Sequence, residues 1–369
     1  MSGAGAGFGM GGPFTFPQSK ISGSCTLTSV ANASGAVQAA YNQWKSSFVT
    51  SNGAGGFLRV QRDSANQNDT VSEGIGYGML AAVYMGDEPT FDGLFCYARS
   101  HFDAKGLMNW HLTSGGAIAS GGAGSATDGD EDMIWSLLMA SDQWSNGGAN
   151  CAGTNVNYLA AAKTMIDAMF FGQNFGPDGL IGDGDGSGTP SMTHPDYFSP
   201  AYFRVFQRAS GDDFTQIIDK GYTVLAQVSG NNGLVPDTTN EQYALLGNYG
   251  YDACRTPWRI AMDYCFNNEP RAKTYLMKIG PFFSGVGAAN IGDGYAPSGS
   301  QTSGNKNMAF IGPAGVAGMA GYQTLLDGAF NFGANNPGGG NAAYFPQSLR
   351  VVTMLMMSGN FLDYTKLTP

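Results

Sequence analysis

Hydrophobic residues recur along most of the chain at every third or fourth position, which is the spacing of an α-helix. The same pattern is interrupted by segments rich in Gly, Asn, Ser and Asp, where helices are expected to end. A helical solenoid would repeat one segment length, and no such repeat is found in the chain. The pattern predicts helices over residues 34–48, 73–86, 88–102, 130–143, 156–170, 199–210, 213–229, 256–267, 270–283, 308–320, 322–333 and 345–358.

The predicted helices are of two kinds, which alternate. Those that begin near residues 73, 130, 199, 256, 308 and 345 are apolar on most faces, as in the run Val351 to Met356. The others carry one polar or charged face, as in Asp212 to Lys220. A helix that is apolar all round is buried, and an amphipathic helix covers it. Six inner and six outer helices in alternation predict an all-α fold, an (α/α)6 barrel.

The ends and the loops of the chain add two expectations. Residues 1–12 read MSGAGAGFGMGG, and we expect residues 1–20 to form a flexible N-terminal tail. No change of composition marks a boundary after residue 20, so residues 21–369 are expected to form a single domain. The loops at 114–125, 176–195 and 334–341 are much longer than ordinary connections. Loops of this length in a compact domain are usually functional.

Charge and composition limit the classes of partner. The formal net charge is −10 and the calculated pI is about 4.6, which argues against nucleic acids and anionic membranes as partners. No apolar run reaches the roughly 18 residues needed for a transmembrane helix, and no signal peptide is visible. Aromatic residues equal charged residues at 12% each, and flat aromatic faces suit stacking on sugar rings. A neutral polymer therefore fits the composition best.

Metal-dependent and histidine-dependent chemistry finds little support. Five cysteines show no CxxC pair, and we expect them to be buried as small apolar residues. Three histidines are too few for a typical zinc site. Asp183, Asp185 and Ser187 match the first half of a calcium-binding loop, but His194 stands where the loop needs glutamate. We interpret this segment as a Gly/Asp turn and expect no metal and no cofactor.

Three acidic residues lie at or just before the start of a predicted inner helix. They are Glu73 after Ser72, Asp128 in the run Thr127 to Asp132, and Asp252 ahead of Arg255 and Thr256. The inner helices of such a barrel run parallel to one another, so their N-termini meet at one end. Three carboxylates that are distant in sequence would then converge in one cleft.

Helix capping is the alternative explanation for each of these acids. Ser72 and Thr256 are good N-cap residues, Pro257 suits a first helical position, and Asp128 with Glu131 forms a capping box. Asp130, Glu131 and Asp132 are expected to be solvated partners of the helix dipole, with Asp130 kept as a possible contributor to the site. The recurrence of three such acids among glycines, aromatics and arginines favours a site.

Four segments of the chain, in order, resemble those of glycoside hydrolase family 8. The run Ala126 to Met133, continuing through Ala140 and Trp144, resembles the family signature, with Ile134 where alanine is usual. The segments 72–79 (SEGIGYGM), 106–110 (GLMNW) and 251–259 (YDACRTPWR) resemble those that carry the family's general acid, a sugar-stacking tryptophan and its general base. The resemblance also implies an (α/α)6 barrel.

The resemblance implies a role for each matching residue. Glu73 is expected to protonate the glycosidic oxygen, and Asp252 is expected to activate a water on the opposite face of the sugar. Asp128 would bind and distort the sugar at the cleavage point. Arg255 would neighbour the base and contact substrate, and Tyr251 would orient the base or the water.

Several aromatic residues are candidates for sugar binding. Trp110 is the best stacking platform, followed by Tyr344, Tyr197 and Tyr202 near the starts of inner helices. Three tryptophans lie within helical repeats and are assigned to the core, namely Trp44, Trp135 and Trp144. Trp258 could belong to either set. The family often carries a further sugar-binding tryptophan before the segment Tyr197 to Pro200, and none is found here.

The proposed acid must satisfy two opposing demands. A general acid has to keep its proton near the working pH, whereas a helix N-terminus stabilises an ionised carboxylate. Burial of Glu73 and repulsion by Asp128 must therefore outweigh the helix dipole. The base has to stay ionised, which a neighbouring arginine favours. We expect activity to fall at low pH through the base and at higher pH through the acid.

Together these observations predict an inverting endo-β-1,4-glucanase that acts on cellulose-like or mixed-linkage β-glucan. We expect it to be a monomer that is secreted or periplasmic and binds a β-linked polysaccharide. An endo-xylanase or a chitosanase of the same family is the substrate-level alternative, and aspartate at position 252 favours glucan or xylan. The alternatives from other classes are a non-catalytic glycan-binding barrel, which predicts the loss of one carboxylate, and an (α/α)6 polysaccharide lyase, which the acidic balance disfavours.

Overall fold

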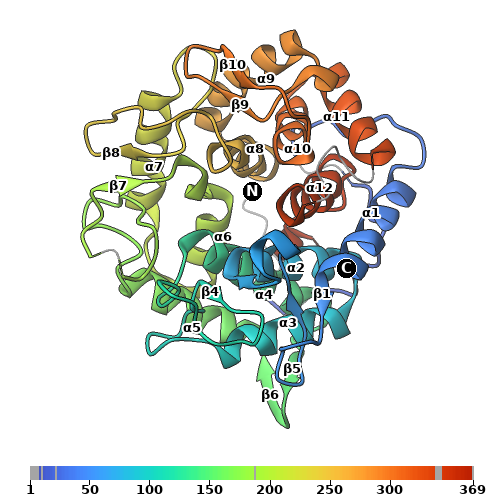
Figure 1. Ribbon diagram of the computed structural model, residues 1–369, viewed down its shortest axis with the longest axis vertical. Helices are drawn as coiled ribbons and strands as arrows, with labels where there is room; N and C mark the ends of the chain where they lie inside the picture. The colour runs from blue at the N-terminus through green and yellow to red at the C-terminus, as the bar shows by residue number, and fades with distance from the viewer. Residues whose placement is uncertain (1–7, 10, 21–22, 187, 337–342, 368–369) are drawn as a thin grey trace, which may run out of the picture.

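A computed structural model describes residues 8–9, 11–20, 23–186, 188–336 and 343–367 of the chain. Twelve α-helices alternate within these residues between an inner and an outer ring (Figure 1). The inner helices are α2 (Ser72–Met85), α4 (Thr127–Gln143), α6 (Pro200–Ser210), α8 (Thr256–Asn267), α10 (Met308–Gly318) and α12 (Tyr344–Met357). The outer helices are α1 (Ala33–Phe48), α3 (Glu88–Ser100), α5 (Tyr158–Phe171), α7 (Thr215–Val228), α9 (Pro270–Val286) and α11 (Gln323–Asn335).

Burial separates the two rings as the hydrophobic pattern predicted. In α4 and α10 every residue is buried, whereas α5 and α11 bury only one face. The predicted (α/α)6 barrel is therefore confirmed. Helix α6 differs from the other inner helices, because its second half leaves Arg208 exposed and Arg204 partly exposed. Both arginines pair with acids, Arg204 with Asp263 and Arg208 with Asp363.

Short strands decorate the barrel within the described residues. Five antiparallel pairs join β1 (Val49–Thr50) to β2 (Arg59–Val60), β3 (Thr70–Val71) to β4 (His111–Leu112), β5 (Gly148–Cys151) to β6 (Thr154–Asn157), β7 (Met192–Thr193) to β8 (Thr239–Asn240), and β9 (Gly294–Tyr295) to β10 (Gln301–Ser303). The β3–β4 and β7–β8 pairs lie beside segments that carry predicted site residues. The β5–β6 hairpin projects from the barrel (Figure 1).

The N-terminal segment differs from the expected flexible tail. Phe14 is buried, its ring stacks on Tyr364 at 4.5 Å between centroids, and its backbone N–H donates to Gln143. The N–H of Gln18 donates to Asn360. Residues 14 and 18 are thus held against the barrel, because burial of the Phe14 ring and these hydrogen bonds favour an ordered segment here. Residues 1–7 and 10 of the predicted tail, and residues 337–341 of the predicted loop at 334–341, lie outside the described residues.

The cysteines also differ from expectation. Four of the five form two disulfides, Cys25–Cys265 and Cys96–Cys151, and only Cys254 is a free, buried thiol. We expected five unpaired cysteines because the partners of each disulfide are far apart in the chain. The separations are 240 and 55 residues, so no local spacing of cysteines indicates the pairing.

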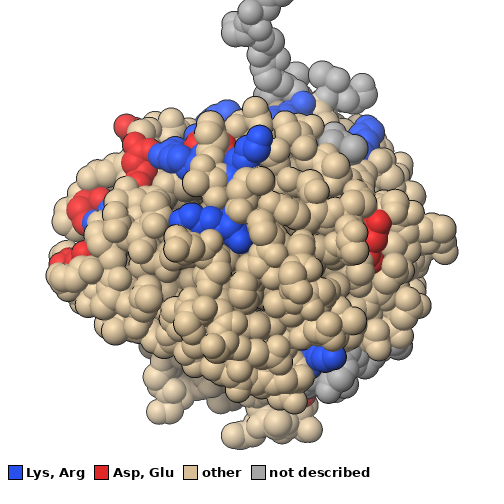
Figure 2. Space-filling view, turned by 90° about the horizontal axis from the view of Figure 1, so that it is seen from above, with Lys and Arg blue, Asp and Glu red and all other residues tan. Residues whose placement is uncertain are grey.

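Charged groups are sparse on the surface, as the composition requires. Figure 2 shows a face on which most residues are uncharged, with small separate groups of basic and acidic side chains. Among the described residues, no helix combines the length and the apolar character that crossing a membrane requires.

Candidate active site

The guanidinium of Arg255 lies at the centre of the site, at the end of the barrel where inner helices begin. Arg255 is 2% exposed and contacts four carboxylates. Its Nη1 lies 2.9 Å from Glu73 and 2.5 Å from Asp128. Its Nη2 lies 2.6 Å from Asp196 and 3.2 Å from Asp252. The structure thus brings together the three acids that the sequence singled out.

Two glycines allow α2 to approach α4 and α12 closely enough for this convergence. A Cβ atom added to Gly129 would lie 2.7 to 2.9 Å from atoms of Ser72 and Glu73. One added to Gly74 would lie 2.8 Å from the hydroxyl of Tyr344. A larger side chain at Gly129 would press on the backbone of the helix that carries Glu73, and one at Gly74 would displace the ring of Tyr344. The glycines around the acids therefore set the spacing of the site.

Glu73 has the surroundings that a general acid needs. The pKa of Glu73 is raised to about 7, mainly by burial and in part by repulsion from the Asp128 and Asp252 charges. Arg255 and the Tyr344 hydroxyl, which donates a hydrogen bond of 2.8 Å to the carboxyl, act in the opposite direction but do not cancel this rise. The conflict between helix dipole and proton retention is thus resolved by burial, and Glu73 holds its proton up to about neutral pH.

Replacement of Tyr344 by phenylalanine should move the basic limb of the pH profile. The hydroxyl favours the ionised form of Glu73, so its removal should raise the pKa of Glu73 further. One neutral hydrogen bond contributes roughly 0.5–1.5 kcal/mol, which corresponds to a shift of about 0.4 to 1 pH unit. Measurement of kcat/KM from pH 4 to 10 tests this. A basic limb that moves to lower pH would contradict the role assigned to the hydroxyl.

Asp252 lies on a short loop before α8, held by the buried end of another loop. One oxygen of Asp237 accepts hydrogen bonds from the backbone N–H groups of Gly250, Asp252 and Ala253. The Asp252 side chain is 48% exposed, in contrast to the 5% of Asp128. The candidate base therefore faces the solvent from which its water would come, while Asp128 lies deeper.

Aromatic side chains form the walls around these acids. Trp110 and Tyr197 line the same pocket of about 170 Å3 as Glu73, Asp128 and Asp252. The indole N–H of Trp110 donates to the carbonyl of Gly121, in the long loop at 114–125. This contact gives that loop a function in positioning the platform.

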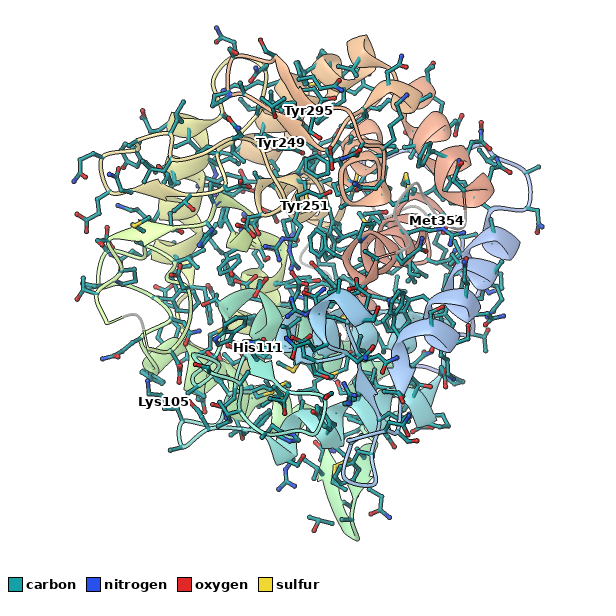
Figure 3. The ribbon with its side chains drawn as sticks, in the orientation of Figure 1. Lys105, His111, Tyr249, Tyr251, Tyr295 and Met354 are labelled. Atoms are coloured by element: carbon teal, nitrogen blue, oxygen red, sulfur yellow. A yellow bond between two sulfur atoms is a disulfide. The ribbon has the colours of Figure 1, made fainter. Side chains whose placement is uncertain are left out.

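Tyr251 precedes Asp252 in the chain, but its hydroxyl bonds to other partners than that carboxylate. The hydroxyl donates to Asp293 at 2.7 Å and accepts from Asn307 at 3.1 Å. The Tyr251 residue is 41% exposed. Figure 3 shows Tyr251 and His111, which follows Trp110, on opposite sides of the barrel centre. The hydroxyl of Tyr251 thus bonds to Asp293 and Asn307 rather than to the candidate base.

The capping interpretation of these acids is wrong in detail. Helix α2 begins at Ser72 itself, α4 begins at Thr127, and neither has a side-chain cap hydrogen bond. Helix α8 begins at Thr256, again without a side-chain cap. The predicted caps fail because Ser72 and Thr256 are themselves the first residues of their helices, and because Asp128 pairs with Arg255.

The three acids after Asp128 are buried, although we expected them to be solvated. Asp130, Glu131 and Asp132 are each 0% exposed. Asp132 accepts two hydrogen bonds from Arg259, and burial raises the pKa of Asp130 and Glu131 well above the ordinary range. The expectation failed because every face of α4 is covered, so no position in its first turn meets water.

Some aromatic candidates belong to the core. Tyr202 is 0% exposed and stacks on Trp135 at 4.3 Å, so its assignment to sugar binding is wrong. Trp258 is also 0% exposed, with the Arg259 guanidinium 4.1 Å from its ring. Trp44 and Trp135 are buried as expected, and Trp144 packs at the edge of the core.

Sequence reasoning missed two polar residues next to the site. Asp196 is 1% exposed and pairs with Arg255, while His194 lies 3.9 Å from Asp252. The pKa of Asp196 is raised to about 7, because the effect of burial exceeds the opposing effect of the Arg255 charge. The only sequence feature that could have indicated them is the pair of polar residues in His194-Pro195-Asp196, just before an apolar segment.

The segment that matches half of a calcium loop makes other contacts. Asp183 contacts His194, and Asp185 accepts a hydrogen bond from the backbone of Ser125. Ser187 lies outside the described residues. In the described part of the chain, these acids form no cluster that could hold a metal ion.

Comparison with known proteins identifies the relatives of this chain. The family profile described as "Glycosyl hydrolases family 8" matches residues 14–359. Endoglucanase A of Acetivibrio thermocellus is 38% identical over 340 residues, which cover 88% of this chain and 69% of that protein. The apo structure of a β-1,3-1,4-glucanase from Paenibacillus sp. X4 superposes with a TM-score of 0.85 at 31% identity, covering 95% of this chain and 99% of the other. A variant of Rex8A from Paenibacillus barcinonensis, complexed with an arabinofuranosyl-xylotetraose, shares the fold, with a TM-score of 0.73 at 20% identity and coverage of 93% and 98%.

Proposed function

The chain belongs to glycoside hydrolase family 8 and is a glycoside hydrolase, and from this premise we propose an inverting endo-β-1,4-glucanase that cleaves cellulose-like or mixed-linkage β-glucan. The observation that carries the proposal is the convergence of Glu73, Asp128 and Asp252 on one guanidinium inside an aromatic-lined pocket. A non-catalytic barrel would have no need to keep a protonated acid and an exposed carboxylate in one pocket.

Each carboxylate has a distinct part in the proposed reaction. Glu73 gives its proton to the glycosidic oxygen as the bond from that oxygen to the anomeric carbon breaks. Asp252 removes a proton from a water molecule whose oxygen bonds to the same carbon from the opposite face. Asp128 contacts the sugar at the cleavage point and accepts from Arg255. The proton on Asp252 then leaves to solvent, and Glu73 is protonated again.

The positions of the acid and the base suit an intervening water. Glu73 and Asp252 contact opposite nitrogens of the guanidinium, at 2.9 and 3.2 Å. Because each carboxylate contacts a different terminal nitrogen, the guanidinium keeps the two carboxyl groups apart. Inverting enzymes hold them roughly 6.5–9.5 Å apart to leave room for the water.

Glucan is the favoured substrate within the family. Relatives at 38% and 31% identity are named endoglucanase and β-1,3-1,4-glucanase, whereas the structure with a bound xylooligosaccharide is only 20% identical. Trp110 and Tyr197 line the pocket and offer aromatic surfaces on which a β-linked chain of sugars can stack. A monomer would suffice for this activity, because every proposed residue comes from one chain.

Two disulfides support an extracytoplasmic location. Disulfides persist in oxidising compartments and are rare in the reducing cytosol. A polysaccharide is also too large to enter a cell intact, so an enzyme that cleaves it has to act outside the cytoplasm. We therefore propose that the protein is secreted or periplasmic.

The stereochemistry of the first product tests the mechanism. Hydrolysis of barley β-glucan or a cello-oligosaccharide, followed by 1H NMR in the first minutes, should show the α-anomer before mutarotation. Initial appearance of the β-anomer would mean retention and would overturn the proposed mechanism. Reducing-sugar release from β-glucan, carboxymethyl cellulose, xylan and chitosan should rank the glucans first, and a preference for xylan or chitosan would contradict the proposed substrate.

A further inference from the structure

His194 lies between two hydrogen-bond acceptors at the edge of the site. Its Nδ1 lies 2.9 Å from the backbone carbonyl oxygen of Asp237, and its Nε2 lies 3.3 Å from a carboxylate oxygen of Asp183. A carbonyl oxygen only accepts, so Nδ1 must carry a hydrogen. An ionised carboxylate also only accepts, so Nε2 must carry one as well. A ring with both nitrogens protonated is an imidazolium cation.

The same ring faces the candidate base. Nδ1 of His194 lies 3.9 Å from Oδ2 of Asp252, while Nη2 of Arg255 lies 3.2 Å from Oδ1. Each oxygen of the half-exposed carboxylate thus has one cation beside it. The ring of Tyr197 packs against His194 at 4.9 Å between centroids and fixes its plane.

We propose that His194 is a positioning residue for the general base, which orients the Asp252 carboxylate and stabilises its negative charge through the charge of the imidazolium, with Asp183 as the anchor of the ring. The proposal rests on the assignment of Asp252 as the base. It gives the 176–195 loop a function, because that loop supplies both His194 and its anchor.

The charged groups around the ring support its protonation. Burial opposes the charge, but the hydrogen bond to Asp183 and the carboxylates of Asp196 and Asp252 outweigh it and raise the pKa of His194 to about 9. The hydrogen bond from His194 in turn lowers the pKa of Asp183. The ring therefore stays charged through the range in which Glu73 keeps its proton.

The base itself faces charges of both signs. Arg255 and His194 are the cations beside it, and Glu73, Asp196 and Asp237 are the acidic groups within electrostatic reach. Removal of one cation leaves the repulsion by these acids less well balanced. The negative charge that the base must carry is then less well stabilised.

Activity measurements on charge variants separate this function from a merely structural one. In His194→Gln, the acidic limb of kcat/KM on β-glucan should move to higher pH by about 0.5 to 1 unit, as expected for loss of a charge at about 4 Å in a half-exposed site. The basic limb should stay in place. His194→Lys should restore much of the shift, and His101→Gln, outside the site, should change neither limb. An unmoved acidic limb in His194→Gln, or an equal shift in His194→Lys, would overturn the proposal.

NMR gives a test that needs no activity. The chain has only three histidines, so the 15N signals of His194 can be assigned by their absence in His194→Gln or by their change in Asp183→Asn. The wild-type ring should be doubly protonated at pH 8, and Asp183→Asn should lower its titration midpoint by about one unit or more. A neutral His194 at pH 8 would overturn the proposal even if His194→Gln does not fold. Full activity in Asp252→Asn would instead overturn the assignment of the base.

Discussion

Replacement of Glu73 by glutamine should lower kcat on β-glucan by about 10²–10⁴, the range that general acid catalysis contributes. Glutamine keeps the size of the side chain, and its amide can still accept from Arg255 and donate to the hydroxyl of Tyr344. It has no acidic proton to give to the glycosidic oxygen. KM should change little, since the sugar-stacking residues are untouched. Initial rates over a range of β-glucan concentrations measure both parameters.

A second glutamate-to-glutamine variant, away from the site, tests whether removal of a negative charge alone lowers kcat. Glu241 is exposed on the loop after β8, and Glu241→Gln should keep wild-type kcat. The loss in Glu73→Gln should also shrink on an aryl β-cellobioside whose phenol leaves without protonation. A Glu73→Gln enzyme within tenfold of wild type on β-glucan would remove Glu73 from the role of acid. An equal loss on both substrates would point to damage elsewhere in the site.

The fold was largely predictable because the inner helices are apolar on almost every face. Their runs, such as the one from Met308 to Gly318, differ sharply from the one-sided pattern of the outer helices. Predicted and observed boundaries agree within a few residues for this reason. Helix α6 deviates because its polar residues Arg204 and Arg208 find acidic partners on other elements, which no local pattern reveals.

The sequence indicated which acids converge in the site, but not which neighbouring acids are buried or which arginines they pair with. Local sequence around Glu73, Asp128 and Asp252 shows helix starts with glycines, and these positions did converge. Burial of the neighbouring acids depends on what packs against α4, and sequence alone gave the opposite expectation for Asp132. Its partner Arg259 is 127 residues away. The pairing of Asp196 with Arg255 likewise exists only in the folded protein.

The arrangement also explains why four carboxylates can share one small region. Arg255 supplies one positive charge and His194 a second, while burial keeps Glu73 protonated up to about pH 7. Removal of one partner from a buried ion pair leaves an uncompensated charge and lowers the free energy of unfolding by several kcal/mol. The protonated acid is thus a consequence mainly of its burial, to which the repulsion of the neighbouring carboxylates adds.

Asp252→Asn should lower kcat by a similar factor of about 10²–10⁴, through loss of the group that activates water. Asparagine can still accept a hydrogen bond from Arg255, so the fold should persist. Asp167→Asn on the exposed face of α5 serves as the control and should keep full activity. Asp252→Asn with more than a tenth of wild-type kcat would contradict the assignment of the base.

Azide distinguishes the base from the acid by its chemistry. It is an anionic nucleophile with no proton to remove, so it does not need a general base, and the uncharged amide in Asp252→Asn no longer repels it. Azide should therefore restore turnover in Asp252→Asn and give an α-glycosyl azide, because attack comes from the face opposite the leaving group. Glu73→Gln should gain nothing on β-glucan, since its leaving group still needs a proton. A β-glycosyl azide, or rescue of Glu73→Gln rather than Asp252→Asn, would reverse the two assignments.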